Sequence, residues 1–134
     1  MSEFALSLDN KVYVNSFYNI DLVTICDLDG NLKCNIFGPD GSNNEGNKKS
    51  YFFGIAMFDE SIIASYIGDI GLINGINGPR GNIPSKFLVF DIKGNYKKTI
   101  ETGYKFTYFC VDEENMRVIV YFDSRPKQLG YINL

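Results

Sequence analysis

The chain has 134 residues, of which 45% are hydrophobic and 22% are charged, a balance that suits one folded domain and excludes a disordered protein. Its net charge is −3 without a basic stripe, which excludes a general nucleic-acid binder because such proteins neutralise phosphates with clustered Lys and Arg. No apolar run approaches the roughly 20 residues of a membrane-spanning helix, and the N-terminus lacks a signal-peptide pattern, so we expect no membrane span.

Segments with strand character follow one another along the whole sequence. In the first of them Phe4, Leu6 and Leu8 alternate with Ala5 and Ser7, which is the two-residue period of a strand. The chain holds 11 Phe and 9 Tyr against three Ala, a composition that favours strands over helices. We expect strands over residues 4–8, 11–17, 22–26, 32–37, 52–58, 61–66, 86–90, 96–100, 106–111, 117–122 and 129–134.

Two of the connections carry the same turn motif, Asp-x-x-Gly-Asn, at residues 27–31 and 91–95. The Asp side chain can accept hydrogen bonds from its own turn, and Gly adopts a positive φ without steric cost. Each motif therefore predicts a tight hairpin between the strands on either side.

The turns recur at a nearly fixed period. Asp9, Asp59 and Asp112 occupy corresponding turns and are 50 and 53 residues apart. Four strands per unit at such a period are typical of β-propeller blades. The sequence thus predicts an all-β protein in a single partial propeller domain over residues 1–134. Its blades would cover residues 4–38, 51–101 and 105–134, and the third would lack its outer strand.

The segment at 12–38 resembles an NHL-type blade, since its third strand ends in Asp-x-x-Gly and its fourth ends near Phe-Gly. The segment at 109–123 resembles the inner strands of blades in TolB-like six-bladed propellers, many of them exported bacterial proteins. The resemblance implies a six-bladed ring of which this chain supplies half. It also implies a periplasmic or cell-surface location if a longer parent protein is exported; the localisation is otherwise open.

Three blades cannot close a ring, because a propeller needs at least about four. In such families the N-terminus often supplies the outer strand of the last blade, and here residues 1–3 are too few for that. We therefore expect one of two arrangements. Either two copies of the chain form a homodimer that completes the ring, or the chain is a piece of a larger protein whose remaining blades complete it.

The tight turns are expected at one face of the blades and the long connections, 38–50 and 67–85, at the other. Binding residues are sought first in unusually long loops, although tolerated insertions are an alternative reading. The ligand-binding candidates are polar residues of these two loops: Asp40, Asn43, Asn44, Glu45, Asp69, Arg80 and Asn82. The second loop is apolar enough that we expect it to fold back or to meet a partner.

Catalytic patterns are nearly absent. The chain has no histidine, which excludes histidine-based triads and histidine-ligated zinc. The segment 40–46 hints at a calcium loop but lacks the glycine at the sixth position and the Glu at the twelfth, which is Tyr51. We expect no metal site, no cofactor and no catalytic residue.

Two function classes remain. The first is a non-catalytic binding or scaffolding module that presents its long-loop face to a protein, peptide or glycan. The alternative is a hydrolase or lactonase-like propeller with a divalent metal in its central channel. The absence of acidic residues and Asn from the middles of the expected inner strands speaks against the alternative, so the chain is expected not to be an enzyme.

Three cysteines, Cys26, Cys34 and Cys110, allow at most one internal disulfide. No Cys-x-x-Cys pair is present, so a zinc or redox role is not indicated. We expect all three to be buried, reduced thiols, because free cysteine packs as a small hydrophobic residue.

Overall fold

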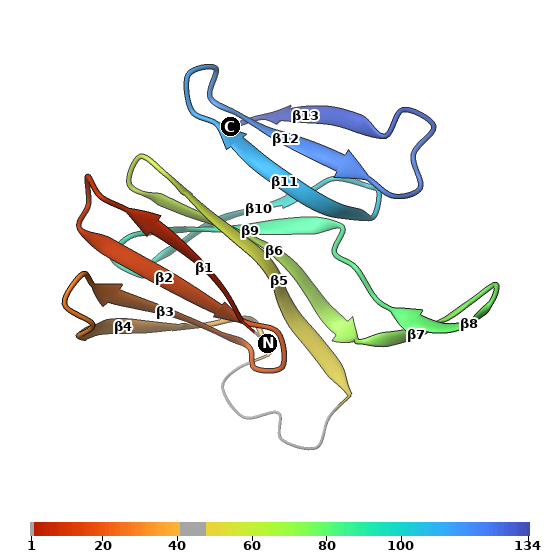
Figure 1. Ribbon diagram of the computed structural model, residues 1–134, viewed down its shortest axis with the longest axis horizontal. Helices are drawn as coiled ribbons and strands as arrows, with labels where there is room; N and C mark the ends of the chain where they lie inside the picture. Colours follow the sequence, from red (N-terminus) through yellow and green to blue (C-terminus); the bar gives the residue numbers. More distant parts are fainter. Residues whose placement is uncertain (1, 41–47) are drawn as a thin grey trace.

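The computed structural model describes residues 2–40 and 48–134, and in this part of the chain every regular element is a strand (Figure 1). The strands pair antiparallel in three main sheets and one separate hairpin. The all-β class is confirmed. No helix that could cross a membrane occurs among the described residues.

The three sheets follow each other along the chain. Sheet 1 has the order β1-β2-β3-β4, sheet 2 the order β10-β9-β6-β5, and sheet 3 the order β11-β12-β13. The strands of sheet 1 are β1 (Ser2–Ser7), β2 (Val12–Phe17), β3 (Leu22–Asp27) and β4 (Leu32–Phe37). Those of sheet 2 are β5 (Lys49–Phe58), β6 (Ser61–Ile70), β9 (Lys86–Asp91) and β10 (Tyr96–Glu101). Those of sheet 3 are β11 (Phe106–Asp112), β12 (Arg117–Phe122) and β13 (Leu129–Asn133).

The second long connection contains more structure than the sequence predicted. Strand β6 continues to Ile70, and residues 72–81 form a hairpin of β7 (Leu72–Gly75) and β8 (Gly78–Gly81). The hairpin extends away from the three sheets (Figure 1). The segment pairs with itself but does not fold back onto the sheets, because Leu72 and Ile76 are exposed on it. The alternative expectation, that it meets a partner, stays a prediction.

The two Asp-x-x-Gly-Asn turns have nearly the same geometry, which confirms the prediction from the motif. Oδ1 of Asp27 accepts from the backbone N–H of Asp29 and of Asn31, at 3.0 and 2.9 Å. Oδ1 of Asp91 accepts from the equivalent residues at 2.9 Å each. Gly30 and Gly94 have φ values of 90° and 93°, the left-handed region for which glycine is suited.

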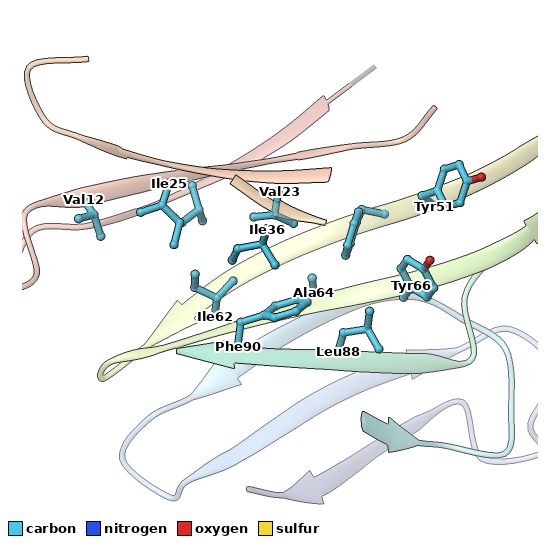
Figure 2. Packing of buried hydrophobic residues seen from close by; sticks show 12 residues of the cluster. Val12, Val23, Ile25, Ile36, Tyr51, Ile62, Ala64, Tyr66, Leu88 and Phe90 are labelled. Carbon is cyan, nitrogen blue, oxygen red and sulfur yellow. The ribbon is translucent and has the colours of Figure 1, made fainter. Parts of the chain in front are cut away.

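Two separate hydrophobic cores hold the sheets together. Figure 2 shows the first core, in which Val12, Ile25 and Ile36 of sheet 1 point toward Ile62 and Phe90 of sheet 2. The second core lies between sheets 2 and 3, and its buried members are Phe58, Ile63, Phe87, Val89, Phe106, Val118, Val120 and Phe122. Sheet 2 is thus packed on both faces.

The first strand of each sheet lies beside the first strand of the next. Strand β1 contacts β5, and β5 contacts β11 (Figure 1). The backbone of Gly54 in β5 is close enough to β11 that an added Cβ would lie 3.2 Å from the ring of Phe109. The connecting turns of these first strands therefore meet at one end of the molecule.

The expectation of three buried cysteines is wrong in part. All three are free thiols, but Cys26 alone is buried, while Cys34 is half-buried and Cys110 is exposed. Cys110 pairs with Ile119 on the face of sheet 3 that points away from the second core, and on this face Tyr108 is also exposed.

Candidate functional site

A buried carboxylate organises the end of the molecule at which the long connections lie. Asp21, in the turn between β2 and β3, is fully buried and accepts hydrogen bonds from the Tyr66 hydroxyl at 2.9 Å and the Asp40 backbone N–H at 2.7 Å. A Cβ on Gly38 would overlap the Asp21 carboxylate, so only glycine fits there. This network joins sheet 1 to strand β6 of sheet 2.

The candidate Asp40 belongs to the rim of the same network. Its carboxylate pairs with Nζ of Lys49 at 2.8 Å and lies 3.5 Å from the Tyr51 hydroxyl. The bond to Asp40 raises the pKa of Lys49, so this amine stays charged. Burial, followed by the bond to Asp21, raises the pKa of Tyr66 above its ordinary value, so its hydroxyl keeps its proton. Lys49 and Tyr66 therefore both keep their protons near neutral pH.

Of the other described candidates, Asp69 lies near the Asp40–Lys49 pair, and its charge is a minor cause of the raised pKa of Lys49, whereas Arg80 and Asn82 do not join this pair. Asp69 lies at the end of β6, where its carboxylate accepts from the Ile70 backbone N–H at 2.7 Å. Arg80 lies on β8, where all four residues are exposed. Asn82 is buried and closes the base of the hairpin, because its side chain donates to the Ile70 carbonyl at 2.9 Å and accepts from Lys105. Asn43, Asn44 and Glu45 lie outside the described residues.

A groove of about 700 Å³ does lie at this end of the molecule, between the β2–β3 turn and the base of the β7–β8 hairpin. We call it the long-loop groove. Its backbone is fixed by the hydrogen bonds from Tyr51 N–H to the Tyr18 carbonyl and from Gly71 N–H to the Lys48 carbonyl, at 2.8 and 2.9 Å. Its lining combines amines, an aromatic ring and exposed aliphatic side chains: Tyr18, Asn19, Lys48, Lys49, Ser50, Ile70, Gly71, Leu72 and Gly81.

A second hollow, of about 570 Å³, lies at the opposite end, where the inner turns meet. We call it the turn hollow. The side-chain amide of Asn10 donates to the Asp59 carbonyl at 2.6 Å and so links the turns of sheets 1 and 2. Its lining is acidic and apolar, and it includes Leu8, Asp9, Met57, Asp59, Glu60, Glu113 and Met116.

The turn hollow was not predicted, although the sequence contains a signal for it. Asp9, Asp59 and Asp112 were matched as equivalent turns on one face, which implies that these turns converge if the first strands are neighbours. Non-glycine residues with positive φ occur in each of the three turns, at Lys11, Asp59 and Met116, with φ of 55°, 50° and 50°. No pattern of residue types separates these turns from ordinary hairpin turns, and so their meeting point was not predicted.

Neither hollow has the donor set of a metal site. No group of three or more His, Cys, Asp or Glu side chains within residues 2–40 and 48–134 is placed to hold a metal ion. The acidic residues of the turn hollow come from separate turns and do not converge in such a group.

No family model matches the sequence, and no curated protein matches it either.

Proposed function

We propose that the chain is a non-catalytic binding module, built from three propeller-like blades, that uses its long-loop groove to hold a peptide segment of another protein. The propeller-like arrangement is supported by the way in which neighbouring sheets pack, which is the same for sheets 1 and 2 as for sheets 2 and 3. Each sheet packs its face against the next, and the first strands β1, β5 and β11 lie side by side. Blades around a common axis have this relation.

The chemistry of the long-loop groove favours a peptide. Ile70 and Leu72 offer apolar surface that is 52% and 68% exposed, and the Tyr18 ring, held edge-on by Phe53 at 6.4 Å, offers a flat aromatic contact. Lys48 adds an exposed cationic side chain at the edge. An apolar side chain followed by a carboxylate would match this combination, since apolar surface supplies affinity and the charge orients the ligand.

Panning a random peptide library displayed on phage against the full chain tests this proposal. We expect enrichment of sequences that pair an aliphatic or aromatic residue with Asp or Glu, and binding of these peptides should fall at least tenfold in Leu72→Ser.

Leu8→Ser is the matched control, because Leu8 is 71% exposed, close to the 68% of Leu72, but lines the turn hollow. Loss of binding in Leu8→Ser alone would assign the ligand to the turn hollow instead. Failure to enrich any sequence would reject peptide binding.

A further inference from the structure

Sheets 1 and 3 carry apolar side chains on two faces, but within residues 2–40 and 48–134 one face of each sheet packs against a neighbouring sheet. In sheet 2, residues 61–67 of β6 and 87–90 of β9 are buried without interruption, as expected for strands with a neighbour on both sides. In β2 and β12 buried residues alternate with half-buried or exposed ones. Most of the half-buried or exposed residues in these two strands are apolar or aromatic: Tyr13, Phe17, Ile119 and Tyr121.

The open face of sheet 1 can be defined from strand register, because residues directly opposite each other in an antiparallel pair point to the same side. Leu6 lies opposite Tyr13, and Tyr13 lies opposite Cys26. Phe4, two residues before Leu6, is 72% exposed and Leu6 is 53% exposed. We call the surface formed by these side chains and Phe17 the leading face.

The open face of sheet 3 is richer in aromatic residues. Tyr108 lies opposite Tyr121, which lies opposite Leu129, and Cys110 lies opposite Ile119, which lies opposite Tyr131. Tyr108, Leu129 and Tyr131 are 75%, 68% and 60% exposed. We call this surface the trailing face.

The geometry points to a second copy of this chain as the partner of both faces, so that the trailing face of each copy packs on the leading face of the other. This inference rests on the proposed propeller arrangement. The chain already makes the same kind of contact twice, from sheet 1 to sheet 2 and from sheet 2 to sheet 3. A third contact of this kind between copies, made twice about a two-fold axis, gives a closed six-sheet ring without a free face.

The area available is sufficient for a stable dimer. A fully buried aromatic side chain removes about 150–250 Å² from water, so the exposed parts of Phe4, Tyr108, Tyr121 and Tyr131 alone would bury about 400–600 Å² at each contact. The ring contains two such contacts. With Leu6 and Leu129 added at both, the total reaches the range of about 1,200–2,000 Å² that specific interfaces bury.

The ring also fixes which strands meet. Because β1 lies beside β5 and β5 beside β11, strand β11 of one copy should lie beside β1 of the other. The exposed thiol of Cys110 would then face the leading-face positions Phe4 and Leu6. A cysteine placed there can form a disulfide with Cys110 across the interface if the two Cα atoms come within about 7 Å.

The experiment is oxidative cross-linking of the full-length variants Phe4→Cys and Leu6→Cys, read by non-reducing electrophoresis. We expect at least one of them to form a covalent dimer, and the added substitution Cys110→Ser should abolish it. Ile76→Cys, at the fully exposed tip of the β7–β8 hairpin, is the control and should not cross-link to Cys110.

A ladder of trimers and longer products would overturn the two-copy ring, because it would mean that the contact does not close. Absence of a cross-link in both variants, with a folded protein by circular dichroism, would overturn the interface. Neither result tests peptide binding at the long-loop groove, because no residue that lines the groove belongs to either open face, so the two proposals fail separately.

Discussion

Sheets 2 and 3 are made of similar residues but have different surroundings. The sequences of β9, Lys-Phe-Leu-Val-Phe-Asp, and β12, Arg-Val-Ile-Val-Tyr-Phe, are both nearly continuous apolar runs. In β9 residues 87–90 are all buried, whereas in β12 Val118 and Val120 are buried while Tyr121 is 42% exposed. An uninterrupted apolar strand predicts a neighbour on each face, and sheet 2 has both of its neighbours within the chain. Sheets 1 and 3 each have one.

The largest difference between sheet 2 and sheet 3 should appear in the free energy of unfolding when an aromatic side chain is replaced by alanine. Phe87 is fully buried and stacks on Phe106, with ring centroids 4.6 Å apart. Phe87→Ala should lower the free energy of unfolding by about 3–5 kcal/mol, because it removes buried contacts and leaves a cavity. Tyr108→Ala, at a 75% exposed ring of sheet 3, should cost less than about 1 kcal/mol in dilute solution.

Urea denaturation at two protein concentrations measures both effects. If a second copy covers Tyr108, the cost of Tyr108→Ala should rise with concentration, since association stabilises the folded state by mass action. Equal costs for the two variants in dilute solution would mean that the two sheets do not differ in burial as described.

The contact between sheet 1 and sheet 2 should depend on its buried polar network. Asp21→Ala leaves the Tyr66 hydroxyl and the Asp40 N–H without their acceptor in a buried place, so we expect a loss of about 2–4 kcal/mol. Asp69→Ala, which removes an exposed carboxylate at the same end, should change stability by less than about 0.5 kcal/mol. A double-mutant cycle with Tyr66→Phe should show that the two losses are not additive; strict additivity would contradict the network.

The two glycine turns provide a matched pair for the same comparison. Gly30→Ala in sheet 1 should cost about 1 kcal/mol from its positive φ alone, because nothing lies within 4 Å of the added Cβ. Gly94→Ala in sheet 2 should cost about 1 kcal/mol more, because its Cβ would lie 3.1 Å from Sγ of Cys34 in the neighbouring sheet. Thermal unfolding of both variants measures the difference, and a smaller loss for Gly94→Ala would contradict the packing of this turn.

The smallest expected difference is between the pKa values of the two carboxyl groups in the same turns, those of Asp27 and Asp91. Hydrogen bonds from the Asn31 and Asn95 backbones are the main cause that lowers the pKa of Asp27 and of Asp91 below the ordinary value of 3.8. A lowered pKa in the folded state means that this stabilisation is present above about pH 4 and is lost as the pH falls through the folded pKa. Titration followed by NMR should give nearly equal midpoints for both, because the turns are local; a midpoint at the ordinary value for either would contradict the turn geometry.

The features that could be predicted from the sequence are those determined by residues close together in the chain. The eleven strands of the three sheets and the Asp27 and Asp91 turns were predicted from periodicity and turn chemistry, which act over a few positions. The role of Asp21 was not predicted, because its partner Tyr66 lies 45 residues away and the segment around Asp21 has the composition of an ordinary break. The β7–β8 hairpin was missed because its strands are short and contain three glycines and one proline, which strands usually avoid.

The exposure of Cys110 was also missed, and the reason is instructive. Burial was expected because free cysteine packs as a small hydrophobic residue, and Cys110 lies instead on a face of sheet 3 that is exposed. A neighbouring copy would restore the expected burial of this thiol.

The mass of the protein in solution is the most direct test of whether a second copy covers the two open faces. Light scattering coupled to size-exclusion chromatography at micromolar concentration should give about 30 kDa, twice the 15.2 kDa of one chain. Tyr131→Asp, which places a charge on the trailing face, should return the mass to that of one chain without unfolding it. A wild-type protein that is well folded and elutes at 15.2 kDa would contradict the dimer.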